Sequence, residues 1–589
     1  MHDFRISVSV AAVGLFFLAM GLLAGCSSTS PYTLGPVKTH DPDDRPTPPP
    51  AETEENQYWD RVDMSVFHQL EKPLNLNWTG RRVGQALGIA EKDEADNVNV
   101  LDEPPNSSWW TRRHFYDEMT PRELAIGPNQ RDTTGLSAGP AQGTWTETSG
   151  KMQGASRGFQ IKDSRGDRYL IKLDGPKWPE LASSAEVIST KILYAAGYYV
   201  PQNTVTRFSL DQLEVDEEAE VRDGNTRRSM TREDLTEILE PYDRGSDGTV
   251  RGVASKFVDG RPLGPFWFQG TRAGDPNDRV RHEQRRELRG LRVISSWLND
   301  ADRRHANTLA VYTDEQYVKH YLLDMGSTLG ANASGVHRTI HGQAYLIDHR
   351  KIPQAVLALG GYSFPWWRYE HETPYKAVGY FRADVFAPGE WVPTYPNPAF
   401  EKMTRRDAFW GAKIVMSFSD EDLAAIVETA RISNPDAEAE LLEVLRKRRD
   451  EIGRYWYGRV NPLDRFVVEQ DPTQTGTSAG ESGQTLHFDD LAVTGGLETA
   501  AARRYTYRLY LDGEPLGPET GAGTSRVPLA VDGRALGTVL GERGRTGEHD
   551  RVVRVDLRTH QAGGVSSETQ VYVYVPETGS ARVVGVRRL

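Results

Sequence analysis

Alternating apolar and polar residues predict several short strands in the first half of the chain. These strands cover residues 144–149, 159–162, 168–174 and 204–210. Between the third and the fourth, residues 179–196 carry apolar side chains at helical spacing and are followed by Gly197, which is typical of a helix end. The pattern therefore predicts three strands that form a meander, then a helix, then a further strand.

A second periodic segment, residues 281–299, predicts a long helix that leads into a polar loop with Asp302 and Asn307. Two short strands are predicted next, and Asp324 ends the second of them. This spacing suits a phosphoryl-transfer site, in which Asp302 orients a hydroxyl while Asn307 and Asp324 hold a metal ion on ATP phosphates. Asp300, in the same loop, is an alternative to Asp302.

Charged residues upstream complete this hypothesis. Lys172 lies in the third predicted strand, and Glu186 lies on the helix after it. A lysine that grips phosphates needs a carboxylate to hold it in place, and these two residues are candidates for such a pair. Glu180 is a competing partner, although an acidic residue in the first helical turn often serves only the helix dipole. The alternative for Lys172 is an ordinary lysine of an edge strand.

The loop after the first predicted strand is rich in glycine. Gly150, Gly154 and Gly158 lie in it or at its ends. Without a Cβ atom, glycine lets backbone amides approach a ligand closely. We therefore expect Gly154 and Gly158 to contribute to a nucleotide site.

Taken together, residues 144–470 resemble the atypical protein-kinase group, which includes HipA-like, phosphoinositide and secretory-pathway kinases. The resemblance rests on the order strand, glycine loop, strand, strand with Lys172, helix with Glu186, and on the loop DADRRHAN followed by LLDMG. The sequence departs from the family pattern in three ways. His305 stands one place later than the family histidine, Met325 replaces the usual Phe, and no typical activation loop follows.

The resemblance implies an α+β, bilobal kinase-like domain with an N-lobe at 144–260 and a C-lobe at 261–470. ATP and Mg²⁺ would be its cofactors. Lys172 would bind phosphates, Glu186 would orient it, Asp302 would be catalytic, and Asn307 and Asp324 would hold the metal. The backbone of Lys256, Phe257 and Val258 would face the adenine base. The motifs GFQIKD, AEVI and GYYVP also resemble a family of uncharacterised bacterial lipoproteins.

The N-terminus reads as a targeting segment. Residues 1–25 combine a short basic stretch with an apolar run and small residues before Cys26, which resembles a bacterial lipoprotein signal peptide. Lipid on Cys26 would anchor the protein in the cell envelope, and Ser27 favours the outer membrane over the inner one. Residues 26–57 are rich in Pro, Ser and Thr and predict a spacer. We expect no transmembrane helix downstream.

Composition narrows the function further. The net charge of −13 argues against a nucleic-acid partner. A single cysteine excludes an intrachain disulfide and, once lipidated, thiol chemistry. The protein would instead meet an envelope protein or glycan as its substrate.

The remaining segments predict supporting parts. Residues 58–143, with the pair Trp109 and Trp110, predict an extension that packs on the kinase-like domain. Residues 211–243 are strongly charged and predict an insertion with one helix at 232–239. Residues 471–484 predict a flexible linker, and residues 485–589 predict a small all-β sandwich.

Two other functions stay open. The kinase-like domain would be catalytically inactive if it has been reused as a binding module of the envelope, where ATP is expected to be scarce. Alternatively, His337, His341 and Asp348 would hold a metal for hydrolysis, although nearby glycines argue against a stable helix there.

Overall fold

The computed structural model has a mixed α+β fold, as the sequence predicts. It describes residues 30–53, 93–129, 139–150, 158–223, 226–332, 335–348, 351, 363–371, 373–470, 483–529, 531, 533–561 and 563–589. Cys26 and Gly154 lie outside these residues, as do the signal peptide and most of the predicted linker at 471–484. No helix of the described residues is long and apolar enough to span a membrane.

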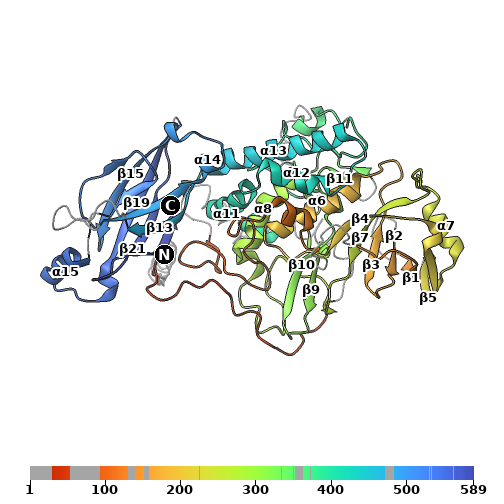
Figure 1. Ribbon diagram of the computed structural model, residues 1–589, viewed down its shortest axis with the longest axis horizontal. Helices are drawn as coiled ribbons and strands as arrows, with labels where there is room; N and C mark the ends of the chain where they lie inside the picture. Colours follow the sequence, from red (N-terminus) through yellow and green to blue (C-terminus); the bar gives the residue numbers. More distant parts are fainter. Residues whose placement is uncertain are drawn as a thin grey trace, which may run out of the picture.

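A seven-stranded sheet, here called the N-terminal sheet, opens the predicted kinase-like domain (Figure 1). Its strand order is β4-β7-β3-β2-β1-β5-β6. The strands are β1 (Trp145–Gly150), β2 (Gly158–Lys162), β3 (Arg168–Lys172), β4 (Asn203–Phe208), β5 (Leu213–Asp223), β6 (Thr226–Ser229) and β7 (Val250–Lys256). The four strands predicted between residues 144 and 210 are thus present, with ends that differ by one or two residues, and Gly158 belongs to β2 rather than to the loop.

The charged segment 211–243 extends this sheet, which differs from the predicted solvated insertion. It contains helix α7 (Arg232–Leu239), as predicted, but also β5 and β6, and β5 pairs in parallel with β1. Its few apolar side chains, among them Leu213, Leu235 and Leu239, pack on one face of the sheet. On the opposite face, Val205 and Val253 form a small apolar cluster with Val187 of α6.

Helix α6 (Leu181–Ala195) lies between the N-terminal sheet and the helical region that follows. Asp174 fixes its start, because the carboxylate accepts hydrogen bonds from the backbone N–H groups of Glu180 at 3.1 Å and Ser183 at 2.7 Å. Almost all of the helix is buried. Most of its apolar residues join the core of the helical region, so α6 connects the sheet to that region.

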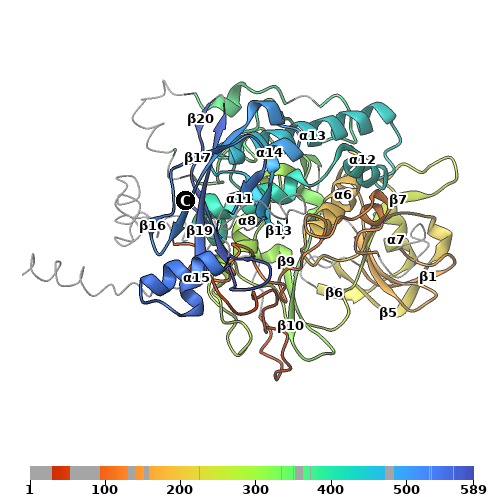
Figure 2. The same cartoon turned by 60° about the vertical axis from the view of Figure 1, so that its left-hand side comes forward.

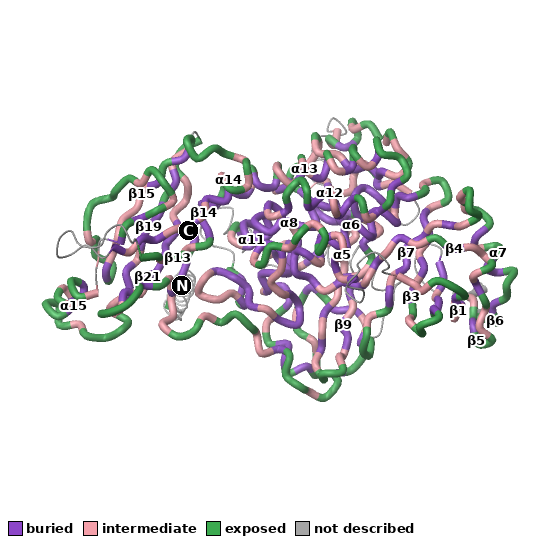
Figure 3. The backbone as a smooth tube through the Cα atoms, in the orientation of Figure 1, coloured by how far each residue is buried: buried purple, intermediate pink, exposed green. Residues whose placement is uncertain are grey.

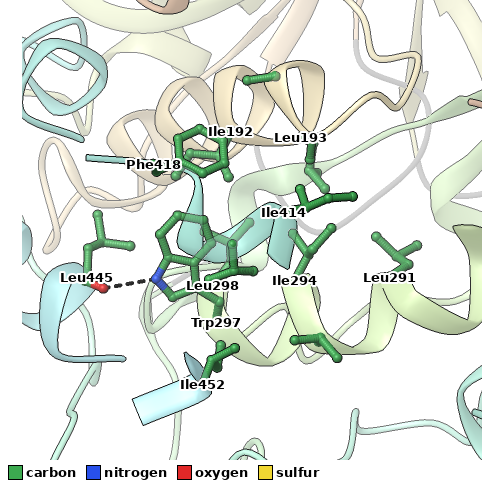
Figure 4. Packing of buried hydrophobic residues seen from close by; sticks show 14 of the residues in the cluster. Ile192, Leu193, Leu291, Ile294, Trp297, Leu298, Ile414, Phe418, Leu445 and Ile452 are labelled. Carbon is green, nitrogen blue, oxygen red and sulfur yellow. Dashed lines mark hydrogen bonds between the residues drawn. The ribbon is translucent and has the colours of Figure 1, made fainter. Parts of the chain in front are cut away.

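The helical region surrounds α8 (Arg286–Leu298). Its other helices are α10 (Pro398–Lys402), α11 (Arg405–Met416), α12 (Asp420–Glu428) and α13 (Pro435–Tyr457). Trp297 lies at the centre, fully buried, and its indole N–H donates to the Leu445 carbonyl at 2.9 Å (Figure 4). A small sheet of β8 (Arg261–Pro262), β9 (Thr308–Tyr312) and β10 (Val318–Leu322) lies beside these helices.

Residues 30–53 lie along the body of the protein, whereas the sequence predicted a free spacer (Figure 1). The backbone N–H of Thr33 donates to Val584, and that of Thr53 donates to Leu263. Asp43 is buried and accepts hydrogen bonds from the backbone and the hydroxyl of Ser108. A proline-rich segment has no internal hydrogen bonds, so its backbone is free to bond to neighbouring elements in this way.

Residues 93–129, the described part of the predicted extension, pack on the helical region. They contain helix α5 (Pro121–Ile126), and Trp110 is fully buried with its indole N–H on the Ala196 carbonyl at 2.8 Å. Trp109 stacks on the imidazole of His320 with ring centroids 3.4 Å apart. The two tryptophans are thus packing residues.

The C-terminal domain contains two sheets with a shared core (Figures 1 and 2). One sheet has the strand order β13-β14-β18. The other has the order β16-β15-β19-β21-β22, and in it β17 also pairs with β15 and β20 with β19. These strands are β13 (Leu463–Gln470), β14 (Gln484–Asp490), β15 (Arg504–Leu511), β16 (Glu514–Pro515), β17 (Thr520–Ala522), β18 (Arg526–Pro528), β19 (Val552–Gln561), β20 (Gly564–Val565), β21 (Thr569–Tyr574) and β22 (Arg582–Arg588).

Two details of this domain differ from the prediction. Its first strand is β13, which pairs with β14 across the predicted linker, so the domain begins near residue 463 rather than 485. It also contains helices α14 (Leu491–Thr494) and α15 (Gly533–Glu542), so it is not all-β. Leu536 and Leu540 of α15 are buried in the domain core, so apolar packing holds the helix against the sheets.

A buried ionic cluster joins three parts of the chain, and we call it the junction cluster. Its centre is Asp102, whose carboxylate accepts from Arg286 of α8 at 3.0 Å, Arg406 of α11 at 2.6 Å and Arg588 of β22 at 3.1 Å. Arg588 also pairs with Asp464 of β13 at 3.2 Å. The three guanidinium groups outweigh the cost of burial and hold the pKa of Asp102 well below its usual range.

Candidate functional site

Lys172, Glu186 and Asp324 meet although they come from three separate elements. Lys172 ends β3, Glu186 lies in α6, and Asp324 follows β10. The Lys172 ammonium lies 3.0 Å from Glu186 Oε1 and 3.0 Å from Asp324 Oδ1. Burial alone would lower the pKa of Lys172, but the two carboxylates raise it above its usual value, so the side chain is a cation at neutral pH.

The two carboxylates differ in exposure. The Glu186 side chain is 2% exposed, whereas that of Asp324 is 53% exposed. Glu186 thus anchors the lysine from inside, and Asp324 holds it from the solvent side. Asp324 has φ 54° and ψ 69°, a left-handed conformation that is uncommon outside glycine and that recurs at functional sites.

Asn203 of β4 fixes Glu186 from behind. Its amide N–H₂ donates to Glu186 Oε1 at 3.0 Å and to the Thr190 hydroxyl at 2.8 Å. The other oxygen, Glu186 Oε2, is buried without a hydrogen-bond partner, and a Cβ atom added at Gly326 would lie 3.0 Å from it. Gly326 therefore leaves room beside the carboxylate that a larger residue would reduce.

The loop from Asp300 to Asn307 is held against the segment of Asp324 by one buried guanidinium. Arg303 donates to Asp300 Oδ2 at 2.7 Å and to the carbonyls of Asn307 and Leu323, both at 2.9 Å. The Leu323 backbone N–H in turn donates to the Asn307 carbonyl at 2.9 Å. Asp300 is thus a structural partner of Arg303, which favours Asp302 as the functional aspartate of this loop.

Asp302 lies at the surface end of this loop. Asn307 Nδ2 donates to its carboxylate at 3.1 Å and to its carbonyl at 2.8 Å, and the Arg304 guanidinium lies 2.9 Å from Oδ1. Burial raises the pKa of Asp302, Arg304 opposes this, and the nearby charge of Asp324 adds to it. Asp302 and Asp324 are therefore close enough for their charges to interact.

Gly158 lies directly opposite Lys172 in the pairing of β2 with β3. A Cβ atom at this position would lie 2.1 Å from the Ile171 carbonyl oxygen, so only glycine permits this approach of the strands. Its role is therefore to pack β2 against the strand that carries Lys172. Gly154, its predicted companion, lies outside the described residues.

The predicted adenine-facing segment is only partly free to bind a base. The backbone N–H of Lys256 donates to the Gln202 carbonyl at 2.9 Å, and that of Phe257 donates to the Arg168 carbonyl at 3.0 Å. The Lys256 ammonium pairs with Asp167 at 3.1 Å. Neighbouring elements already accept from these two amides, and the prediction that the backbone of Lys256 to Val258 faces a base stays a prediction.

His337 and His341 lie close together, with ring centroids 4.5 Å apart. The backbone N–H of Arg338 donates to His341 Nδ1 at 2.8 Å, so the neutral ring carries its proton on Nε2. Burial lowers the pKa of both histidines. Across the described part of the chain, no three His, Cys, Asp or Glu side chains gather as a metal site, so Asp348 adds no third ligand and the hydrolase hypothesis gains no support.

Two residues of the site escaped the sequence analysis. Arg303 bonds to the Asp300 carboxylate in its own loop and to the carbonyls of Asn307 and Leu323, whereas the side-chain partners of Asn203 lie on α6. The signal for Arg303 was its position between Asp302 and Asn307. Asn203 had no such signal, because nothing in the sequence places β4 behind α6.

Comparison with known proteins adds no relative: no family model, no curated protein and no solved structure matches this chain.

Proposed function

We propose that residues 144–457 form an atypical kinase-like domain that binds ATP with Mg²⁺ and transfers the γ-phosphoryl group to a protein or glycan hydroxyl. The observation that carries the proposal is the position of the Lys172 ammonium, 3.0 Å from both Glu186 and Asp324. A phosphate-binding lysine needs this arrangement, with a buried carboxylate to hold it and an accessible one beside it. The strand and helix order of the N-terminal sheet also follows the expected resemblance.

Each residue then has a defined task. Lys172 holds phosphate oxygens, and Glu186, fixed by Asn203, keeps the ammonium in place. Asp302 orients the acceptor hydroxyl and takes its proton, for which a raised pKa is favourable. Transfer of a phosphoryl group depends on positioning and charge neutralisation more than on covalent chemistry, which fits a site built of charged side chains.

The donor atoms fit a magnesium ion. Asn307 and Asp324 offer oxygen ligands, the type that Mg²⁺ prefers, and phosphate oxygens and water would complete the shell. One Asp and one Asn with phosphates require no larger cluster of acidic side chains. When bound, the ion would neutralise phosphate charge during transfer.

Nucleotide binding is tested by the thermal stability of the protein with ATP and MgCl₂. ATP with magnesium should raise the melting temperature by several degrees at saturation, because a ligand that binds only the folded state stabilises it. Lys172→Met and Asp324→Ala should abolish the shift. Asp314→Ala, which removes an exposed carboxylate from the turn between β9 and β10, should retain it. An equal shift in all four proteins would refute the site.

Catalysis is tested separately with γ-labelled ATP and envelope extract as acceptor. Asp302→Ala should keep the thermal shift but reduce transfer by roughly a hundredfold or more, since positioned proton transfer contributes about that factor. Transfer that survives in Asp302→Ala would remove Asp302 from the mechanism.

One observation favours the inactive binding module as a second candidate. Arg304 pairs with Asp302 at 2.9 Å and thus competes with an acceptor hydroxyl for the same carboxylate. For this candidate, ATP or a related ligand would shift the melting temperature, but no labelled product would form with any acceptor, and Arg304→Ala would not restore it.

We also propose that lipid on Cys26 anchors the protein in the bacterial cell envelope, with the outer membrane favoured. The support is the sequence before Cys26. Replacement of Cys26 by Ala should release the protein from the membrane fraction, and retention there would contradict the anchor.

A further inference from the structure

A cavity of about 680 Å³ lies behind helix α6, on the side away from Lys172. Its walls come from α5, α6, β4, α12 and the start of α13. This volume is in the range of small-molecule sites in proteins. Apolar side chains form part of the lining, among them Ile126, Val187, Val205 and Ala425.

Part of the cavity lining is cationic. Lys191 is buried, and Arg122 and Arg431 line the cavity as exposed side chains. Burial and the Arg431 charge lower the pKa of Lys191 to about 8. Its ammonium donates to the carbonyls of Ala125 and Ile126, which leaves one of its three N–H groups. Among the described residues, neither Lys191 nor Arg431 forms a salt bridge with a carboxylate.

The other charged pair in the lining is acidic. Glu428 ends α12, and Glu438 lies in the first turn of α13. Burial and the charge of Glu428 raise the pKa of Glu438. Each like-charged pair is thus unfavourable by itself, although the opposite charges line the same cavity. Lys191 is buried, Glu438 is half-buried, and Arg431 and Glu428 are exposed, so the lining offers charges of both signs to a ligand.

We propose that this cavity binds a small apolar zwitterion, a short peptide or an amino acid. Its carboxylate lies against Lys191 and Arg431, its ammonium against Glu428 and Glu438, and its apolar side chains against Val187, Val205 and Ala425.

The cavity has a direct route to the proposed nucleotide site. Asn203 lines it and also donates to Glu186, which holds Lys172. A ligand that displaces Asn203 on binding would therefore affect the position of Glu186. This link rests on the proposed function, whereas binding in the cavity does not.

The test uses the full chain without nucleotide, titrated with leucine and leucyl-leucine in a calorimeter. At least one should bind, and the one that binds tighter identifies the amino acid or the peptide as the occupant. Its N-acetyl and amide derivatives, which each lack one charge, should bind roughly tenfold weaker, because hydrogen bonds between charged groups are the strong ones. Absence of binding, or equal binding of charged and blocked forms, would overturn the proposal.

Variants test which side chains bind the carboxylate and the ammonium group of the ligand. Lys191→Met should bind the zwitterion and its amide equally, and Glu438→Gln should bind the zwitterion and its N-acetyl form equally. Ala425→Phe should fill the cavity and abolish binding, whereas Ala424→Phe, on the same helix but outside the lining, should not. If Lys191→Met does not fold, the comparison of Ala425→Phe with Ala424→Phe still tests the location of the site. Unchanged binding in Ala425→Phe would refute the location, whatever the protein does with ATP.

Discussion

Glu147 is a buried carboxyl group on β1 of the N-terminal sheet. It is 0% exposed, and both of its oxygens are buried without a hydrogen-bond partner. Burial, with a smaller contribution from Asp234, raises its pKa from the ordinary 4.5 to about 8. A residue that carries this cost without a partner makes the stability of the sheet depend on pH.

The direction of that dependence follows from proton binding. Between pH 4.5 and about 8, the folded protein keeps the Glu147 proton while the unfolded chain has lost it. The contribution of this group to stability therefore falls as the pH rises through that window and is lowest above it. We expect Glu147→Gln to raise the free energy of unfolding by about 2 kcal/mol at pH 8.5 and to change it little at pH 5.

Urea unfolding at the two pH values measures this effect. Glu214→Gln on β5 is the matched control, because its side chain is exposed and should leave the pH profile unchanged. A Glu147→Gln protein with the same pH dependence as the parent would show that Glu147 is ionised in the folded state.

At the scale of elements, the periodic segments were predictable and the irregular ones were not. The strands around Lys172, helix α6 and helix α8 follow directly from apolar spacing. Strands β5 and β6 escaped because their outward faces are almost entirely charged, which hides the alternation. Strand β13 escaped because it begins close behind α13, and its pairing with β14 becomes visible only in three dimensions.

The residues of the candidate site also divide into those that were predictable from the sequence and those that were not. Lys172, Glu186, Asp302, Asn307 and Asp324 were named from residue type and spacing, and the fold brings the first two and Asp324 into contact. Arg303 and Asn203 were not named, because the role of Arg303 depends largely on backbone carbonyls and that of Asn203 on side chains of another element. Sequence spacing can indicate which side chains carry the charges of the site, but not which residues hold those side chains in position.

Gly158 provides a test at this scale. Gly158→Ala should push β2 away from β3, because the new Cβ atom would lie 2.1 Å from the Ile171 carbonyl oxygen. We expect a loss of about 1–3 kcal/mol in unfolding free energy, typical of overpacking, and a weaker ATP shift through displacement of Lys172. Thermal and urea unfolding measure it.

Gly521→Ala is its control, since this glycine of β17 has no atom near the new Cβ position. A neutral Gly158→Ala substitution would mean that the strands can separate without cost and that the glycine has no structural role.

At the scale of the whole molecule, the junction cluster joins the C-terminal domain to the helical region through Arg588. Figure 3 shows that buried segments run through both the C-terminal domain and the helical region. Asp102 and Arg588 are each 1% exposed in their side chains, so removal of one partner leaves a buried charge uncompensated. We expect Arg588→Met to cost about 3–5 kcal/mol and to expose the domain junction to proteases.

Limited proteolysis with unfolding in guanidinium chloride checks this expectation. Lys447→Met removes one partner of an exposed ion pair with Glu443 at 3.2 Å and should cost no more than about 0.5 kcal/mol. If the two variants lost the same unfolding free energy, the junction cluster would contribute no more than an exposed ion pair.

The contact between Asp102 and Arg588 also bears on how the chain reaches this structure. The two residues are 486 positions apart, so their hydrogen bond closes a loop that contains most of the protein. Local elements such as α6 and the β2–β3 pair form early, whereas closure of so distant a contact must wait until both flanking domains have folded. Until then Arg286 and Arg406 lack one member of their cluster, and we expect docking of the C-terminal domain to be the slow, final phase of folding.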